Sequence, residues 1–200
     1  MSSFVGHSLA AISIYSLARK SHQPFCHRLL WLFWLIIIAC APDIDYFVPA
    51  LNSSAHQNLR ITHSVVASLV LPFCTILIFV IRGFRREMLL KYGFQAILAG
   101  LSHLILDLLV GVTPLPLMWP FVKETFRLPF GILPSAARLD ISDYYFYRNI
   151  FIELGIFVPL LCSAYPIFHT YPVTRRRKLK IIFLLACSSC FVYWAHTMSR

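Results

Sequence analysis

The stretch Gly100–Asp107, which reads GLSHLILD, lies within an apolar run of about residues 88–110. Its His103 and Asp107 are four residues apart, so a helix places both side chains on one face. A bare carboxylate in a membrane-length apolar segment costs roughly 2.5–3.5 kcal/mol on insertion scales. Asp107 therefore needs a counter-charge, and histidine with aspartate is a natural pair of metal ligands. The pattern predicts a membrane helix that carries part of a metal site.

The composition excludes a soluble globular protein. Hydrophobic residues make up 58% of the 200 residues, charged residues only 13%, and the mean hydropathy is +0.72. Apolar runs cover about residues 4–18, 29–41, 61–81, 88–110, 150–168 and 181–195. Since a spanning helix needs about 20 apolar residues, we predict an all-α polytopic membrane protein with five to six transmembrane helices, as one domain over residues 1–200.

Two boundaries and one long connection stand out along the chain. Pro42 is expected to break the second helix, and Thr62 is a plausible N-cap of the third. Residues 113–148 are rich in proline, tryptophan and tyrosine. Because Trp and Tyr favour the headgroup level, we predict an ordered outer interfacial loop with room for a short hairpin.

The positive charges set the orientation. The net charge is +10, and most basic residues lie in short loops after the first, third and fifth runs: Arg19, Lys20, Arg28, Arg82, Arg85, Arg86, Lys91, Arg175, Arg176, Arg177, Lys178 and Lys180. This placement indicates the positive-inside rule rather than nucleic-acid binding. We therefore predict that both termini and the site lie on the outer, non-cytoplasmic side of the membrane.

This topology gathers chemically active side chains at one membrane face. They are His7, Asp43, Asp45, His63, His103, Asp107 and Glu153. Histidine and carboxylate ligands without thiolates suit Zn²⁺, Mn²⁺ or Fe²⁺, and the set is large enough for one or two ions. All but Glu153 are predicted ligands, and Asp45 or Glu153 is the candidate general base. Arg60 and Arg127 are candidates to hold an anionic group.

Each residue also has a structural interpretation. His103 and Asp107 can fasten two helices, the two acids after Pro42 can form an ordinary turn, and Glu153 can sit at a helix N-terminus. His56 lies on the same side in a polar loop, and its participation is open. The convergence of all these residues on one face favours the metal site.

An ordered set of short motifs resembles the YdjM-type family of membrane-bound, metal-dependent hydrolases of bacterial inner membranes. The motifs are Gly6-His7-Ser8-Leu9, Ala41-Pro42-Asp43-Ile44-Asp45, Arg60-Ile61-Thr62-His63-Ser64, Leu101-Ser102-His103-Leu104-Ile105-Leu106-Asp107, Trp119-Pro120 and Phe126-Arg127-Leu128-Pro129. The resemblance covers about residues 4–130 and implies a divalent metal bound by these His and Asp residues. It also implies a bacterial inner membrane, so that the predicted outer side is the periplasm. One departure is Arg60-Ile61-Thr62-His63, where the family often has Arg-Gly-x-Thr-His.

Three functions fit the sequence. The first is a hydrolase acting on a lipid or phosphoester substrate at headgroup depth, with membrane lipids as its surroundings. The second is a cation transporter, which polar groups continuing toward the cytoplasmic face would favour. The third is a non-catalytic protein in which His–Asp pairs only fasten helices. The oligomeric state and the metal's identity are left open by the sequence.

Overall fold

The computed structural model describes residues 3–17, 24–135, 143–169 and 174–198. Its α-helices are α1 (Phe4–Leu17), α2 (Phe25–Cys40), α3 (Val65–Ile81), α4 (Arg86–Val110), α5 (Tyr144–His169) and α6 (Arg175–Thr197). The 3₁₀ helices η1 (Ala41–Tyr46), η2 (Pro49–Leu51), η3 (Ser53–His56) and η4 (Ile61–His63) connect α2 to α3. These ranges contain no β-strand, which confirms the predicted all-α polytopic fold.

Four segments are long and apolar enough to cross a membrane. They are Phe25–Tyr46, Arg86–Val110, Tyr144–Tyr165 and Arg175–Thr197. The helices α1 and α3 are apolar but shorter, with 14 and 17 residues. At a rise of about 1.5 Å per residue, α1 is shorter than the hydrocarbon core of a bilayer. The described part of α1 is therefore as short as the first apolar run predicted.

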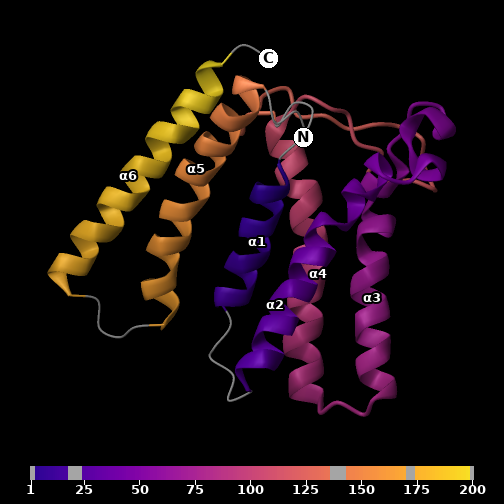
Figure 1. The fold of residues 1–200 in the computed structure, drawn as a ribbon, viewed down its shortest axis with the longest axis horizontal. Coiled ribbons are helices and arrows are strands. Elements are labelled where there is room, and N and C mark those ends of the chain that lie inside the picture. The colour runs from indigo at the N-terminus through magenta and orange to yellow at the C-terminus, as the bar shows by residue number, and fades with distance from the viewer. Residues whose placement is uncertain (1–2, 18–23, 136–142, 170–173, 199–200) are drawn as a thin grey trace.

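The helices alternate in direction, and the start of α1 and the end of α6 lie at the same end of the molecule (Figure 1). That end also holds η1 to η4, the C-terminus of α4 and the N-terminus of α5 (Figure 1). The α3–α4 connection with Arg82 and Arg85 and the N-terminus of α6 lie at the opposite end (Figure 1). The basic residues Arg19 and Lys20, used for the orientation, are outside the described residues.

One predicted helix boundary agrees with the structure and two differ. The second α-helix ends at Cys40, as Pro42 predicted, and the chain tightens into η1, where Asp43 and Asp45 are buried. Thr62 is not the N-cap of α3; Ser64 is, and its Oγ accepts a hydrogen bond from the Ala67 N–H at 3.2 Å. The helix α5 begins at Tyr144, within the predicted loop.

The outer loop is ordered over its described part, 111–135. Leu115 and Phe126 form an antiparallel β-bridge, which is the short hairpin that the sequence suggested. The Val65 N–H donates to the Leu117 carbonyl, and the Ile132 N–H donates to the Leu109 carbonyl. The loop is thereby tied to the N-terminus of α3 and the C-terminus of α4. The predicted loop residues 136–142 lie outside the described residues.

Small residues bring the first helices close together around α4. The buried core between α1, α2 and α4 is formed by Ala11, Leu35, Ile38, Ala39, Ala96 and Ala99. Buried polar side chains pair within this region. The Trp31 indole donates to Gln95 at 2.9 Å, and the Gln95 amide donates to the Ile14 carbonyl at 3.2 Å. Hydrogen bonds of this kind fasten helices where no water is available.

The contact of α3 with α4 depends on Gly100. Pro72, inside α3, has no N–H to donate to the Ser68 carbonyl, and Gly100 packs at this point. A Cβ at Gly100 would lie 2.5 Å from the Ser68 carbonyl oxygen and 3.1 Å from Pro72 Cγ. Only glycine permits this approach, and His103 is one helical turn further along α4.

We expect Gly100→Ala to destabilise the protein by about 1–3 kcal/mol, the usual cost of overpacking, although alanine is the better helix former. The measurement is the thermal unfolding midpoint in detergent, which should fall. Gly93→Ala is the matched control, because its Cβ would meet the flexible Ile76 side chain at 3.1 Å instead of backbone. An unchanged or raised midpoint for Gly100→Ala would contradict this account of the helix contact.

Candidate metal centre

Five buried side chains from distant parts of the chain converge at the end of the bundle that holds η1 to η4. They are His7 of α1, Asp43 of η1, His63 of η4, and His103 and Asp107 of α4. The three histidines are 0% exposed, and the two aspartates are 2–3% exposed. The predicted convergence of these five residues is therefore present in the fold. Two groups of potential ligand atoms, each within 4.8 Å, are His7–His103–Asp107 and Asp43–His63–His103.

The separations between these atoms suit a coordination sphere better than a hydrogen-bond network. His63 Nε2 lies 3.4 Å from both Asp43 Oδ1 and Asp107 Oδ2, and His103 Nε2 lies 3.6 Å from Asp107 Oδ2. These distances exceed those of ordinary hydrogen bonds. Two ligands at about 2.1 Å from one tetrahedral ion are about 3.4 Å apart. The side chains are spaced closely enough to hold a divalent cation.

A hydrogen bond on the side of the ring away from the cluster fixes the orientation of His103. Its Nδ1 lies 2.7 Å from the Ala39 carbonyl oxygen, which can only accept a hydrogen bond, so Nδ1 carries the proton. In the neutral ring Nε2 is then an acceptor that faces the cluster, 3.1 Å from His63 Nε2. His63 Nδ1 in turn lies 3.0 Å from the Thr62 hydroxyl. Such outer partners select the tautomer of metal-binding histidines.

His7 provides the strongest sign that something is to be bound. Its ring stacks on that of His103, with the centroids 3.8 Å apart. Both of its ring nitrogens are buried, and neither makes a hydrogen bond to any described residue. Asp43 Oδ1 is buried without a hydrogen-bond partner in the same way. Because such groups are costly in an apolar interior, these atoms fit a site that holds an ion.

The charge balance points the same way. Asp43 and Asp107 bring two negative charges into a buried site whose other members are imidazoles. Arg60 Nη2 lies 3.6 Å from Asp43 Oδ1, but its close partner is Asp45. A divalent cation would neutralise the two carboxylates and accept lone pairs from the imidazoles.

Asp45 lies beside the two ligand groups rather than within them. Its carboxylate accepts two hydrogen bonds from Arg60, at 2.7 Å from Nε and 2.6 Å from Nη2. The guanidinium lies over the Tyr46 ring, 4.7 Å from its centroid. Burial alone would lower the pKa of Arg60, but the Asp45 hydrogen bonds raise it above its ordinary value. This bidentate pair fixes the end of η1 next to Asp43.

Glu153 is also fully buried, and it anchors the start of α1. Its carboxylate accepts hydrogen bonds from the Ser3 N–H, at 3.0 Å, and from the Ser3 hydroxyl. The Ser3 hydroxyl accepts from the Gly6 N–H at 3.1 Å, and the Ser3 carbonyl accepts from the His7 N–H at 3.1 Å. Glu153, a candidate base, thus holds the turn that carries His7 and is in neither ligand group.

Two other candidates are placed away from the cluster. Arg127 is exposed on the outer loop, and no hydrogen bond or ion pair joins it to the described residues of the cluster. His56 Nε2 lies 2.8 Å from the Ala50 carbonyl within the η2–η3 region, so its partner is local. The structure therefore brings neither side chain to the metal centre.

The sequence analysis missed three residues that support the site: Ser3, Tyr46 and the Thr62 hydroxyl in its role behind His63. A pattern signal existed only for Thr62, which precedes a candidate ligand directly. Ser3 and Tyr46 act through partners at positions 153 and 60. Contacts over such separations leave no periodic trace in the chain.

Comparison with known proteins identifies the family. A family model described as YdjM inner membrane protein matches residues 1–198, well beyond the predicted 4–130. None of the curated proteins and none of the solved structures compared with the chain matches it. The family model covers nearly the whole chain, including both ends of the bundle that builds the cluster. This chain belongs to the family of YdjM inner membrane proteins.

Proposed function

We propose that the chain is a membrane-bound, metal-dependent hydrolase that acts on a phosphoester or lipid-type substrate at the outer face of the inner membrane. The observation that carries the proposal is the buried cluster of His7, Asp43, His63, His103 and Asp107, drawn from four separate elements. Intramembrane ionisable groups gathered in this way mark function more often than stability.

The residues divide into holding and positioning roles. The five side chains of the cluster would hold one or two divalent ions. His103 has only Nε2 available, so it would bind a single ion and could do so with either group. When bound, the metal supplies Lewis acidity and lowers the pKa of water toward neutrality. Asp45 is the carboxylate next to the ligand groups, so it is the proposed proton acceptor, oriented by Arg60. Glu153 positions His7 through Ser3.

The proposed substrate class follows from the depth of the cluster in the membrane and from the positive charge of Arg60 beside it. The cluster lies near the helix ends opposite the α3–α4 connection, which carries Arg82 and Arg85, and the positive-inside rule assigns those basic residues to the cytoplasm. Beside the cluster, Arg60 is partly exposed over the exposed Tyr46. A guanidinium at headgroup depth favours an anionic phosphoester. Arg127 on the exposed loop would meet the substrate before it reaches the cluster.

A transporter has less support. Its polar path would have to continue along the inner halves of the helices, where Gln95 and Thr75 are buried. These groups bond to Trp31, Trp34 and backbone carbonyls of their own bundle. Both side chains are therefore already engaged in fastening helices.

The test is hydrolysis by the detergent-purified full chain of a phosphomonoester, a phosphodiester and a phospholipid, with and without chelator. We expect chelator to abolish hydrolysis and added divalent metal to restore it. Asp107→Asn should lower the rate by more than about 100-fold, beyond the effect typical of outer-shell partners. Asp143→Asn is the matched control, because this carboxylate only accepts the Tyr145 N–H at the start of α5.

Two outcomes would overturn the proposal. One is a metal-loaded wild-type protein that hydrolyses none of the three substrate classes. The other is equal hydrolysis by Asp107→Asn and Asp143→Asn, which would assign the activity to something other than the cluster.

A further inference from the structure

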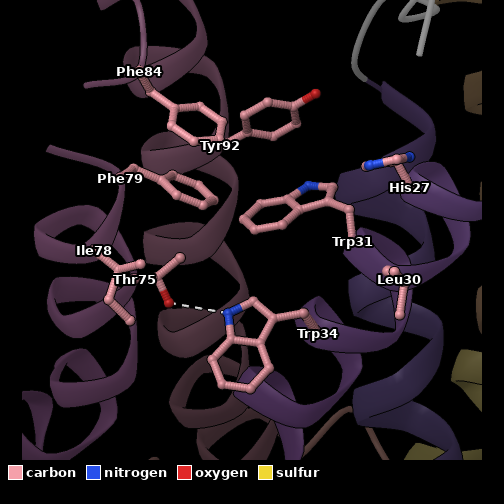
Figure 2. Close-up of a pocket in the computed structure, with 9 residues that line it drawn as sticks. All are labelled: His27, Leu30, Trp31, Trp34, Thr75, Ile78, Phe79, Phe84 and Tyr92. Carbon is pink, nitrogen blue, oxygen red and sulfur yellow. Dashed lines mark hydrogen bonds between the residues drawn. The ribbon is translucent and has the colours of Figure 1, made fainter. Parts of the chain in front are cut away.

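An aromatic groove lies at the end of the bundle opposite to the metal centre. The helices α2 and α3 both pack on α4 but only slightly on each other. Between them is a cavity of about 360 Å³, lined by His27, Leu30, Trp31, Trp34, Thr75, Ile78, Phe79, Phe84 and Tyr92. Figure 2 shows the Trp31, Phe79, Phe84 and Tyr92 rings gathered at one end of this groove and Trp34 at the other.

The lining residues follow from helical periodicity. On α2 they recur at positions 27, 30, 31 and 34, and on α3 at 75, 78 and 79, which is the spacing of one helix face. In a membrane-facing helix such a face normally meets lipid. Here the two faces are turned toward each other and meet where the centroids of the Trp31 and Phe79 rings lie 5.8 Å apart, so they form a groove lined with packed aromatic rings. Trp31 and Tyr92, for example, have ring centroids 4.8 Å apart.

The groove suits an apolar chain rather than a polar ligand. The Trp34 indole N–H donates to Thr75 Oγ1 at 3.0 Å (Figure 2), and the Thr75 hydroxyl donates to the Leu71 carbonyl. The Trp31 indole is likewise engaged with Gln95. These polar atoms are therefore already paired. Leu30 and Ile78 on the flanks are 66% and 52% exposed, so the groove opens sideways toward the bilayer.

The mouth of the groove is basic. His27 lines it at the start of α2, and Phe84 lines it between Arg82 and Arg85 in the α3–α4 connection. The Lys91 ammonium lies 5.8 Å from the centroid of the Tyr92 ring, which also lines the groove. Over residues 24–35 and 75–95 the only acidic residue is Glu87. An apolar slot ending at a cluster of cations is complementary to an acyl chain joined to an anionic headgroup.

We propose that this groove binds an anionic phospholipid of the leaflet that faces the basic loops. One acyl chain lies between α2 and α3 against Trp31, Trp34 and Phe79. The phosphate and its anionic headgroup meet Arg82, Arg85 and Lys91. This site is separate from the metal centre, and it does not depend on the proposed hydrolase activity.

The test uses the two groove tryptophans as reporters. The full chain with Trp119→Phe and Trp194→Phe retains only Trp31 and Trp34, and it is placed in nanodiscs of phosphatidylcholine. Phosphatidylglycerol or phosphatidylcholine with brominated acyl chains is then titrated in over the same range of mole fractions. We expect brominated phosphatidylglycerol to quench the fluorescence at a several-fold lower mole fraction than brominated phosphatidylcholine.

The headgroup contacts are tested by a matched pair of charge removals at the same end of the molecule. Arg82→Gln with Arg85→Gln should remove the preference for phosphatidylglycerol. Arg175→Gln with Arg176→Gln, on the distant α6, removes the same charge and should retain it. The thermal unfolding midpoint of each variant checks that the bundle is intact.

Three results would overturn the proposal. Equal quenching by the two brominated lipids in the reference protein would show an unselective lipid surface. An equal loss of preference in both double variants would indicate a general attraction of net charge. No quenching by either lipid would show that acyl chains do not enter the groove.

Discussion

Replacement of His103 by glutamine is expected to weaken binding of divalent metal by at least about 100-fold, because His103 Nε2 belongs to both candidate ligand groups. Glutamine is chosen over alanine because its amide can still donate to the Ala39 carbonyl and fill much of the space beneath the His7 ring. The measurement is elemental analysis of protein purified in detergent, followed by titration of the stripped protein with Zn²⁺, Mn²⁺ and Fe²⁺.

Single-group variants then count the ions. His7→Gln affects only the group with His103 and Asp107, whereas Asp43→Asn affects only the group with His63 and His103. If two ions bind, each variant should retain about one of them; if one ion binds, both variants should lose it. His56→Gln is the control, since this side chain bonds to Ala50 outside the cluster. Wild-type metal content in His103→Gln would refute the assignment of the ligands.

Removal of the Arg60 side chain should lower the free energy of unfolding more than the Gly100→Ala substitution does. Arg60 and Asp45 have side chains only 11% and 3% exposed, and they share two short hydrogen bonds. Arg60→Met leaves a buried carboxylate without its cation, which typically costs about 3–5 kcal/mol. The measurement is the free energy of unfolding in mixed detergent micelles.

A double variant separates the lost pair from lost packing. Arg60→Met with Asp45→Asn removes both charges and should recover much of the stability, because no unpaired charge remains. Arg148→Met is the matched control. The Arg148 guanidinium also stacks on a tyrosine, 4.8 Å from the centroid of the Tyr145 ring, but it lies outside the cluster. If Arg60→Met costs no more than Arg148→Met, the pair with Asp45 does not stabilise the fold.

Periodicity and charge in the sequence were sufficient for the helical membrane fold. The apolar run around Gly100–Asp107 needed no tertiary information to be placed on a helix, because its length and its buried His–Asp spacing suit only that structure. The alternation of basic and polar connections also predicted that the ends of α2 and α4 and the starts of α1 and α3 meet on one side (Figure 1). The gathering of His7, Asp43, His63 and His103 followed from this topology.

Local conformation was harder to predict where helix ends compete with turns. Ser64 and Thr62 are both good capping residues, and η4 takes up Thr62 so that its hydroxyl faces His63 instead. Pro42 can end a helix or begin a tighter one, and the packing of Asp43 against the cluster accompanies the 3₁₀ turn. Propensity alone does not distinguish these cases.

Only the tertiary structure decided which acids face one another and which are neutralised elsewhere. Asp45 is two residues from Asp43 but pairs with Arg60, and Glu153 holds Ser3, 150 residues away in the chain. The sequence by itself determined the helical class, the membrane setting and the end of the bundle where the polar groups collect. It did not determine their partners, because a carboxylate pairs with whichever donor the packed backbone brings within about 3 Å, and that choice has no period along the chain.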